Sequence, residues 1–272
     1  MATIKPFTAL RPQQQLSQQV ASRPYDVLNS EEAKTEAAGN PFSFLHVTKS
    51  EIDLPAGIDI HSQEVYDKAK ENLQQFIANG ILFKEEKPSY YIYQLVMKGR
   101  SQTGLVCVSS VDDYFKNTIK KHEFTRPEKE KDRIEHMTTI RAQTGNVFLA
   151  YRDVETVNTI IHNWKYTYQP VYNFTATDGI QHAIWVVNDQ SVIDDITSQF
   201  QVNVPFTYIA DGHHRAASAA KVSKSLPDSN EAKYFLTTIF PASQLVILDY
   251  NRVVKDLNGL SASKFLGFLQ DD

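Results

Sequence analysis

The sequence has little cysteine: Cys107 is the single thiol in 272 residues. One thiol excludes an internal disulfide framework and any zinc site built from several cysteines. No apolar run approaches the roughly 20 residues that a membrane-spanning helix needs, and Met1–Phe7 lacks the apolar core of a secretory signal. These absences lead us to expect a cytoplasmic protein with no membrane partner.

Familiar nucleotide-binding and hydrolase motifs are also missing. The sequence contains no Walker A loop, no glycine-rich dinucleotide fingerprint and no G-x-S-x-G elbow. Any phosphate chemistry must therefore use another motif. The net charge is −4, whereas dedicated nucleic-acid binders are usually basic. Segment 116–133 is a local exception, with seven Lys or Arg against four acidic residues.

The composition is that of a globular protein, with 42% hydrophobic and 22% charged residues. No internal repeat or clear linker divides the chain, so we expect a single α+β domain over 1–272. Within it we distinguish an irregular N-terminal segment (1–60), a core that carries the motifs (61–225) and the start of a C-terminal portion (226–272). Because 260–272 has the pattern of a helix cut short, we hypothesise that the chain is the N-terminal part of a longer protein.

The hydrophobic pattern predicts both helices and strands. Apolar residues at helical spacing predict helices over 62–79, 127–143, 154–164, 191–199 and 212–224, and shorter ones within 29–40 and around Tyr114. Aromatic and β-branched runs predict strands over 89–97, 104–109, 169–176, 180–187, 206–210, 234–240 and 245–249. The predicted fold class is mixed α+β, a mostly antiparallel sheet flanked by helices.

The most specific motif is Asp211-Gly-His-His-Arg215, where an expected strand runs directly into an expected helix. A helix N-terminus offers free backbone N–H groups and the positive end of the helix dipole to an anion. Gly212 allows close approach of a ligand, and Arg215 can fork onto phosphate oxygens. We predict Asp211 as the N-cap, or as a ligand for a hydroxyl or Mg²⁺. The alternative is an ordinary capped helix with two surface histidines.

A second group of candidates begins at His122-Glu123, just ahead of the helix expected over 127–143. A carboxylate placed there can act as a general base. The pattern is not that of a zinc protease, because Arg126 stands where the second histidine would be. Residues 125–128 are interpreted as a capping box that opens the helix.

Four polar residues in this helix are expected on one face: Lys129, Asp132, Arg133 and His136. Together they would form a polar wall of an anion pocket. A solvated helix face with an intrahelical ion pair is an equally good interpretation.

The third candidate is Tyr25-Asp26, in the proline-containing segment 22–28. Taken alone, this pattern is typical of a structural turn. By contrast, Cys107, Trp164 and Trp185 lie in apolar patterns and are predicted to be core residues.

These motifs, in this order, resemble those of the domain-of-unknown-function 1015 family of bacteria and archaea. The resemblance rests on Pro24–Val27, His122–Thr125 with Lys129–Arg133, Asp211–Arg215, Ala242–Leu245 and Asp249–Arg252. That family is similar to the ParB/sulfiredoxin-like superfamily, so the resemblance implies a core of that kind with insertions. The superfamily includes free serine kinases, which carry a His-Glu element upstream of a similar Asp-Gly-His-His-Arg turn.

The resemblance implies a small-molecule kinase that transfers a phosphoryl group to the hydroxyl of free L-serine or a similar metabolite. It implies Glu123 as the catalytic base, together with Asp211 and His213, and the turn 211–215 as the phosphate holder. The residues it implies for substrate or phosphate binding are His122, Thr125, Lys129, Arg133, Gly212, His214, Arg215, Tyr25 and Asp26. Mg²⁺ is the implied cofactor, with Asp211 as a candidate ligand. The donor stays open among ATP, ADP and pyrophosphate, and the missing nucleotide loop favours one held through its phosphates alone.

The chain departs from such kinases in the 88 residues that separate Glu123 from Asp211, a longer spacing that implies an inserted helix and hairpin. Two other functions stay open: a non-catalytic module that binds a phosphorylated metabolite, and a nucleic-acid-binding module of the ParB-like superfamily. The basic segment 116–133 supports nucleic acid as a partner, and the net acidity opposes it. A small molecule is the expected partner, and the oligomeric state is open.

Overall fold

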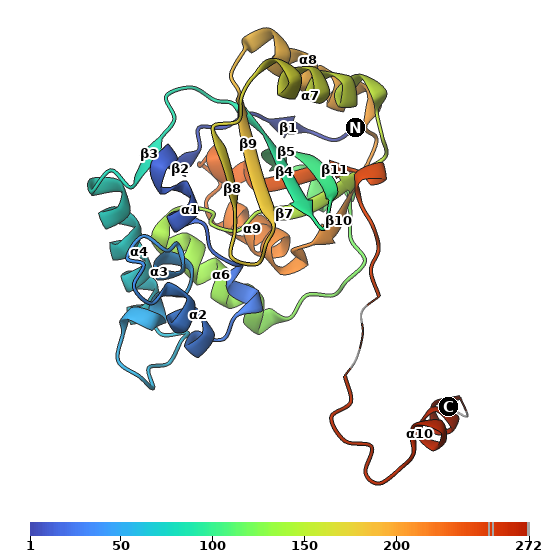
Figure 1. Ribbon diagram of the computed structural model, residues 1–272. Coiled ribbons are helices and arrows are strands. Elements are labelled where there is room, and N and C mark those ends of the chain that lie inside the picture. The colour runs from blue at the N-terminus through green and yellow to red at the C-terminus, as the bar shows by residue number, and fades with distance from the viewer. Residues whose placement is uncertain (250, 252, 271–272) are drawn as a thin grey trace.

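A large mixed sheet forms the centre of the molecule (Figure 1). The computed structural model describes residues 1–249, 251 and 253–270. Within these residues the strand order is β6-β10-β7-β11-β5-β4-β9-β8, and β1 also pairs with β5. The strands are β1 (Ile4–Lys5), β4 (Tyr90–Met97), β5 (Arg100–Ser110), β6 (Ile119–Lys120), β7 (Val147–Tyr151), β8 (Tyr172–Thr175), β9 (Gln181–Val187), β10 (Thr207–Asp211) and β11 (Tyr234–Pro241).

The pairing in this sheet is mostly antiparallel. Among the described strands, β10 with β6 and β11 with β7 are parallel pairs, and the other neighbours are antiparallel. The predicted fold class, mixed α+β with a mostly antiparallel sheet flanked by helices, is therefore confirmed.

Helices lie on two sides of the sheet. Figure 1 shows α7 (Glu155–Thr167) and α8 (Gln190–Asn203) side by side above it and α9 (His213–Ser225) below it. The spacing that predicts α7 matches its buried face, because Val157, Ile161 and Trp164 are all buried. Cys107 and Trp185 lie in the same core, as predicted.

The N-terminal segment forms short helices around a second, smaller core. The helices of this segment are short: α1 (Ser17–Val20), α2 (Ser30–Ala37) and α3 (Leu45–Thr48). Helix α3 packs against α2 and α4 (Gln63–Ala78), α4 packs against α6 (Pro127–Ile140), and α6 also packs against α9. The buried residues of this core are Val20, Val47, Ala69, Leu73, Phe76, Ile81, Leu82 and Ile140. A separate pair of strands, β2 (Leu10–Pro12) and β3 (Leu82–Lys84), lies beside it.

One predicted strand is wrong. Residues 245–249 follow a 3-10 turn (Ala242–Gln244) and, within the described residues, pair with no strand. The side chain of Ile247 is 99% exposed. A β-branched apolar run forms a strand only when another strand is available to hydrogen-bond its backbone. Among the described residues, no strand pairs with this segment.

The sequence patterns miss β7, a central strand of five residues between two helices. They also extend α6 to residue 143, whereas Arg141 turns into the left-handed region with φ of 58° and ends the helix. The capping box predicted over 125–128 is wrong as well. The N-cap is Arg126, which caps through no side-chain hydrogen bond, although Pro127 does occupy the first turn.

The last part of the chain extends from the body of the molecule, and α10 (Ala262–Gln270) lies apart from the sheet in Figure 1. The helix predicted over 260–272 is thus present over its described part, and Asp271 and Asp272 lie outside the described residues, as do Tyr250 and Arg252 of the stretch 249–252. Across the part of the chain that the structure covers, no helix has both the length and the apolar character to cross a membrane.

Candidate functional site

The strand-to-helix turn at 211–215 is built on Gly212. Gly212 is the N-cap of α9, with φ of 94°, a left-handed conformation that favours glycine. A Cβ atom on this residue would lie 3.3 Å from the Arg215 guanidinium carbon and 3.4 Å from the Val147 Cα. The prediction that Asp211 caps the helix is wrong, because its carboxylate instead pairs with Arg215 one turn later, at 2.5 Å.

Arg215 joins two of the sequence motifs. Its side chain is only 14% exposed, and Nη2 lies 3.4 Å from Asp26 Oδ2 as well as 2.5 Å from Asp211 Oδ2. Nη1 donates to the backbone carbonyl of Asn146, in the loop before β7. Asp26 belongs to a single 3-10 turn, Tyr25–Val27. The segment that alone looks like a structural turn is therefore in contact with the Asp211–Arg215 motif.

Tyr25 lies beside two guanidinium groups. The Arg133 guanidinium stacks on its ring at 3.9 Å from the centroid. Burial raises the pKa of Tyr25, although the nearby charges of Arg133 and Arg215 act in the opposite direction. Both arginines and Tyr25 line one pocket together with Gly145.

Arg133 is oriented by Asp132, the residue before it. Its Nε donates to Asp132 Oδ2 at 2.7 Å, while Asp132 Oδ1 accepts from the Tyr66 hydroxyl at 3.0 Å and from His61 Nδ1 at 3.1 Å. Burial opposes the charged form of Asp132, but Arg133 and these donors outweigh it and hold the pKa of this carboxyl below its ordinary value.

The loop before α6 packs on the start of α9. Glu123 Oε2 lies 3.3 Å from Nδ1 of His213, which is buried. The His122 backbone N–H donates to His213 Nε2 at 3.4 Å, and the Arg126 backbone N–H donates to His214 Nε2 at 3.0 Å. Because Nε2 of His213 accepts a hydrogen bond, its proton lies on Nδ1, facing Glu123. Burial and the neighbouring His122 lower the pKa of His213.

A family model described as "Protein of unknown function (DUF1015)" matches residues 4–272. The chain belongs to the DUF1015 family. No curated protein and no solved structure matches it.

Sequence reasoning misses one buried residue of the candidate site, Glu130. It is 5% exposed and accepts a hydrogen bond from the Thr125 hydroxyl, and its other carboxylate oxygen pairs with Lys221 of α9. Burial acts against the charge of Glu130, but Lys221 and Thr125 keep its pKa below the ordinary value. Glu130 thus ties the Glu123 loop to α6 and α9. In the sequence, Glu130 is one acidic residue in a run of charged residues. Such a run is also typical of a solvent-exposed helix face, so the sequence does not show that Glu130 is buried.

Two candidates in α6, Lys129 and His136, have contrasting surroundings. Lys129 is exposed, and its side chain has no hydrogen-bond or ion-pair partner among the described residues. His136 is buried and shares a hydrogen bond with the Val47 carbonyl at 3.0 Å. Of the expected four-residue wall, Lys129 is therefore open to solvent, whereas Arg133 and His136 both line the pocket that Tyr25 and Arg215 share.

The site has few groups that could hold a metal by themselves. In the described part of the chain, no group of three or more His, Cys, Asp or Glu side chains is arranged to bind an ion. Asp211 offers one 67% exposed carboxylate, already paired with Arg215. Mg²⁺ commonly binds through one or two carboxylates and the phosphates of a substrate. These residues fit an ion that arrives with a phosphorylated ligand.

Proposed function

We propose that this DUF1015 protein is a small-molecule kinase with a ParB/sulfiredoxin-like core, which phosphorylates the hydroxyl of free L-serine or a similar metabolite. One observation carries the proposal most directly: Glu123, an exposed carboxylate, lies 3.3 Å from His213, within the motif that also supplies Arg215. A candidate base and a candidate phosphate holder are thus adjacent although 88 residues separate Glu123 from Asp211. The resemblance to free serine kinases supports the same assignment.

In the proposed reaction, Glu123 accepts the proton of the acceptor hydroxyl. The hydroxyl oxygen forms a new bond to the terminal phosphorus of the donor, and the bond from that phosphorus to the bridging oxygen breaks, so that the shortened donor leaves. Phosphoryl transfer depends mainly on positioning and charge stabilisation. Arg215 and the N–H groups at the start of α9 supply positive charge, and His213 holds the Glu123 carboxylate in place.

Mg²⁺, when bound, would neutralise charge on the transferring phosphate. Asp211 is the residue that would contact it, and the remaining ligands would come from the phosphates and water.

The test uses the full chain with L-serine, Mg²⁺ and each of ATP, ADP and pyrophosphate, and measures phosphoserine by mass spectrometry. We expect product with at least one donor and a loss of about 10²-fold or more in Glu123→Gln. Glu128→Gln is the matched control, an exposed acid in the first turn of α6. No phosphoserine with any donor, or equal rates in Glu123→Gln and the wild type, would overturn the proposal.

A second candidate function is a module that binds a phosphorylated metabolite without turnover. The observation that favours it is the double pairing of Arg215 with Asp211 and Asp26, because an anion can displace these acids without any reaction. Calorimetry with phosphoserine distinguishes the two functions. Tight binding that is lost in Arg215→Met, with no product from any donor, would support the binding module.

A further inference from the structure

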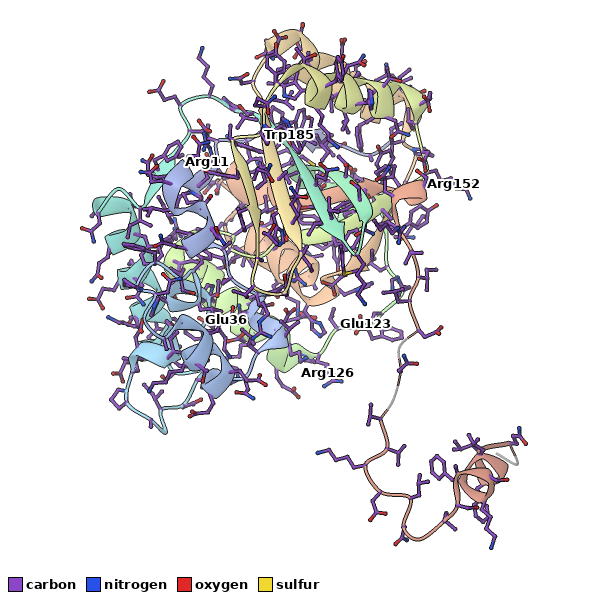
Figure 2. All side chains as sticks on the ribbon, viewed as in Figure 1. Arg11, Glu36, Glu123, Arg126, Arg152 and Trp185 are labelled. Carbon is purple, nitrogen blue, oxygen red and sulfur yellow. The ribbon has the colours of Figure 1, made fainter. Side chains whose placement is uncertain are left out.

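A second pocket lies between the N-terminal helices and α6. Its volume is about 90 Å³, and it is lined by the end of α3, the 3-10 turn Ser50–Asp53, the start of α4, and α6. These elements lie side by side in Figure 1. Glu123, on the loop ahead of α6 in Figure 2, is not among the described residues that line this pocket, and neither is Asp211. The proposed phosphoryl transfer therefore does not account for it.

Two ion pairs line the second pocket, and little of their side chains is exposed. Lys49 Nζ lies 2.9 Å from Glu51 Oε1, and these side chains are 13% and 7% exposed. Arg133 Nη2 lies 2.5 Å from Asp132 Oδ2, and these side chains are 13% and 16% exposed. Removing charges from water costs free energy that apolar side chains in the same places would not cost. Polar groups that converge on one pocket are a feature of ligand-binding sites.

The two carboxylates of this pocket differ in how many hydrogen bonds they already accept. Asp132 accepts from three side-chain donors. Glu51 accepts from the Ser30 hydroxyl at Oε1, the oxygen that also pairs with Lys49, whereas Oε2 accepts no hydrogen bond from a described residue. Glu51 is therefore the acceptor that is left for a positively charged group of a ligand.

Donors around the second pocket are also left over. Arg133 uses Nε and Nη2 for Asp132, and Nη1 donates to no described residue. The Lys49 ammonium has three N–H bonds, and Glu51 is the one acid with which it pairs in the described part of the chain. The Tyr25 hydroxyl, which lines the same pocket, bonds to no described residue. A carboxylate of a ligand would therefore find cationic donors here.

The charges and the volume of the second pocket together define the ligand. The two cations balance the two acids, so a simple anion or a simple cation would leave some of the free groups unmatched. A water needs roughly 10–15 Å³ of such volume, so a pocket of about 90 Å³ holds roughly six to nine atoms other than hydrogen. We propose that the second pocket binds a small free α-amino acid, with its carboxylate on Arg133 and Lys49 and its ammonium on Glu51. Because Glu123 does not line the pocket, this amino acid is a second ligand and not the phosphoryl acceptor.

The test titrates glycine and L-alanine into the full chain by calorimetry, beside glycolate and glycinamide, which each keep one of the two charged ends. Neither amino acid has a hydroxyl to phosphorylate. We expect the amino acids to bind, and glycolate and glycinamide to bind about 10-fold or more weakly than glycine.

The double variant Lys49→Met with Glu51→Gln should weaken amino-acid binding by about 10-fold or more. It removes both charges of the pair, so neither charge is left buried without its partner. Lys68→Met with Glu71→Gln is the matched control, because this ion pair lies on the surface of α4 and lines neither pocket. It should change amino-acid affinity by less than about twofold.

Two results would overturn the inference: no binding of either amino acid at millimolar concentration, or equal affinity in the wild type and in the Lys49 and Glu51 double variant. Equal affinity for glycine and glycolate would overturn it too. Phosphoserine formation is measured separately. If amino-acid binding depends on the Lys49 and Glu51 pair and no phosphoserine forms, the inference stands and the kinase is wrong. If phosphoserine forms and the double variant binds amino acids as the wild type does, the kinase stands and the inference is wrong.

Discussion

At the scale of single residues, Gly212 determines the geometry of the turn. Its left-handed backbone places Arg215 over the turn toward Asp211 and Asp26, and a Cβ atom at residue 212 would lie 3.3 Å from the Arg215 guanidinium, closer than ordinary van der Waals contact. Glycine meets both requirements without strain.

We therefore expect Gly212→Ala to cost about 1–3 kcal/mol of stability and to displace Arg215, so that the phosphorylated ligand of the proposed function binds more weakly. Gly179→Ala is a control for backbone strain, because Gly179 also has positive φ (80°) but an added Cβ would meet no atom within 4 Å. Urea unfolding and calorimetry measure the two effects. Equal ligand affinity in both variants would contradict the positioning role of Gly212.

His136 gives a prediction about pH. Burial, with the nearby charge of Arg133, lowers the pKa of His136 to about 4, compared with about 6.5 in an unfolded chain. Between these values the unfolded chain binds a proton that the folded chain does not, so stability falls as the pH drops from about 6.5 to about 4, by at most roughly 1.4 kcal/mol per pH unit.

The variant His136→Gln keeps a side-chain donor for the Val47 carbonyl and removes this titration. The urea midpoint should fall less between pH 7 and pH 5 in the variant than in the wild type. All other groups titrate alike in the wild type and the variant. If the urea midpoint falls equally in both proteins, His136 is not buried in the neutral form.

The residues that sequence reasoning identifies best are those whose chemistry is unusual in a turn. Gly212, Arg215 and the histidines stand out because capping a helix needs fewer polar groups. Glu130 does not stand out, because it is a buried acid within a run of charged residues. Asn146 does not stand out either, because it contacts Arg215 through its backbone carbonyl, which every residue has. Asp211 is placed correctly at the turn, but its pairing with Arg215 rather than with backbone N–H groups depends on side-chain geometry.

At the scale of elements, α9 connects the site to the core. Its alanines, Ala216, Ala219 and Ala220, are buried against the sheet, and the small side chains allow close packing. Its opposite flank receives Glu130 and the Glu123 loop from the segment around α6. The position of α9 therefore controls the distance between Glu123 and Arg215.

Ala220→Leu tests this packing. Ala220 is 1% exposed, and extra methylenes in a packed core typically cost about 1–3 kcal/mol. Gln201→Leu inserts the same side chain at an exposed position of α8 and should change stability by less than about 0.5 kcal/mol. Denaturant unfolding compares the two variants, and equal stability would mean that α9 packs loosely enough to accept a leucine.

Long periodic elements are predictable here, and short ones are not. Helices α4 and α7 carry enough apolar residues to define a period, and strands β4 and β9 are rich in aromatic and β-branched side chains. By contrast, β1 and β6 have two residues each, and their existence depends on the neighbours to which they bond. The prediction of a strand over 245–249 is wrong for the same reason. The β propensity of these residues is high, but propensity alone does not provide a neighbouring strand to pair with.

At the scale of the whole molecule, the segment after β11 contributes little to the folded body. Gln244 does contribute: its side-chain oxygen accepts from the Thr103 backbone N–H at 3.1 Å, and its carbonyl accepts from Arg100 and Gln102. Beyond it, the exposed apolar residues are Val246, Ile247, Leu248, Val253, Val254, Leu266, Phe268 and Leu269.

A chain that ends at Leu248 should therefore unfold within about 2 °C of the full chain, whereas one that ends at Pro241 should lose about 1–3 kcal/mol with the hydrogen bonds of Gln244 and those of Ser243 to Asp153. Differential scanning calorimetry measures both. If the first shortening destabilises as much as the second, the segment 249–272 packs on the body in solution.

The contact between Arg215 and Asp26 joins residues that are 189 positions apart. Contacts of such high contact order form slowly, because a long loop must close before they yield any stabilisation. The pocket lined by Tyr25, Arg133 and Arg215 would then be complete only late in folding, after the N-terminal helices have docked on α6. A ligand of this pocket binds the native state alone, so at 100 times its Kd it would stabilise the entire cooperative unit by about 2.7 kcal/mol.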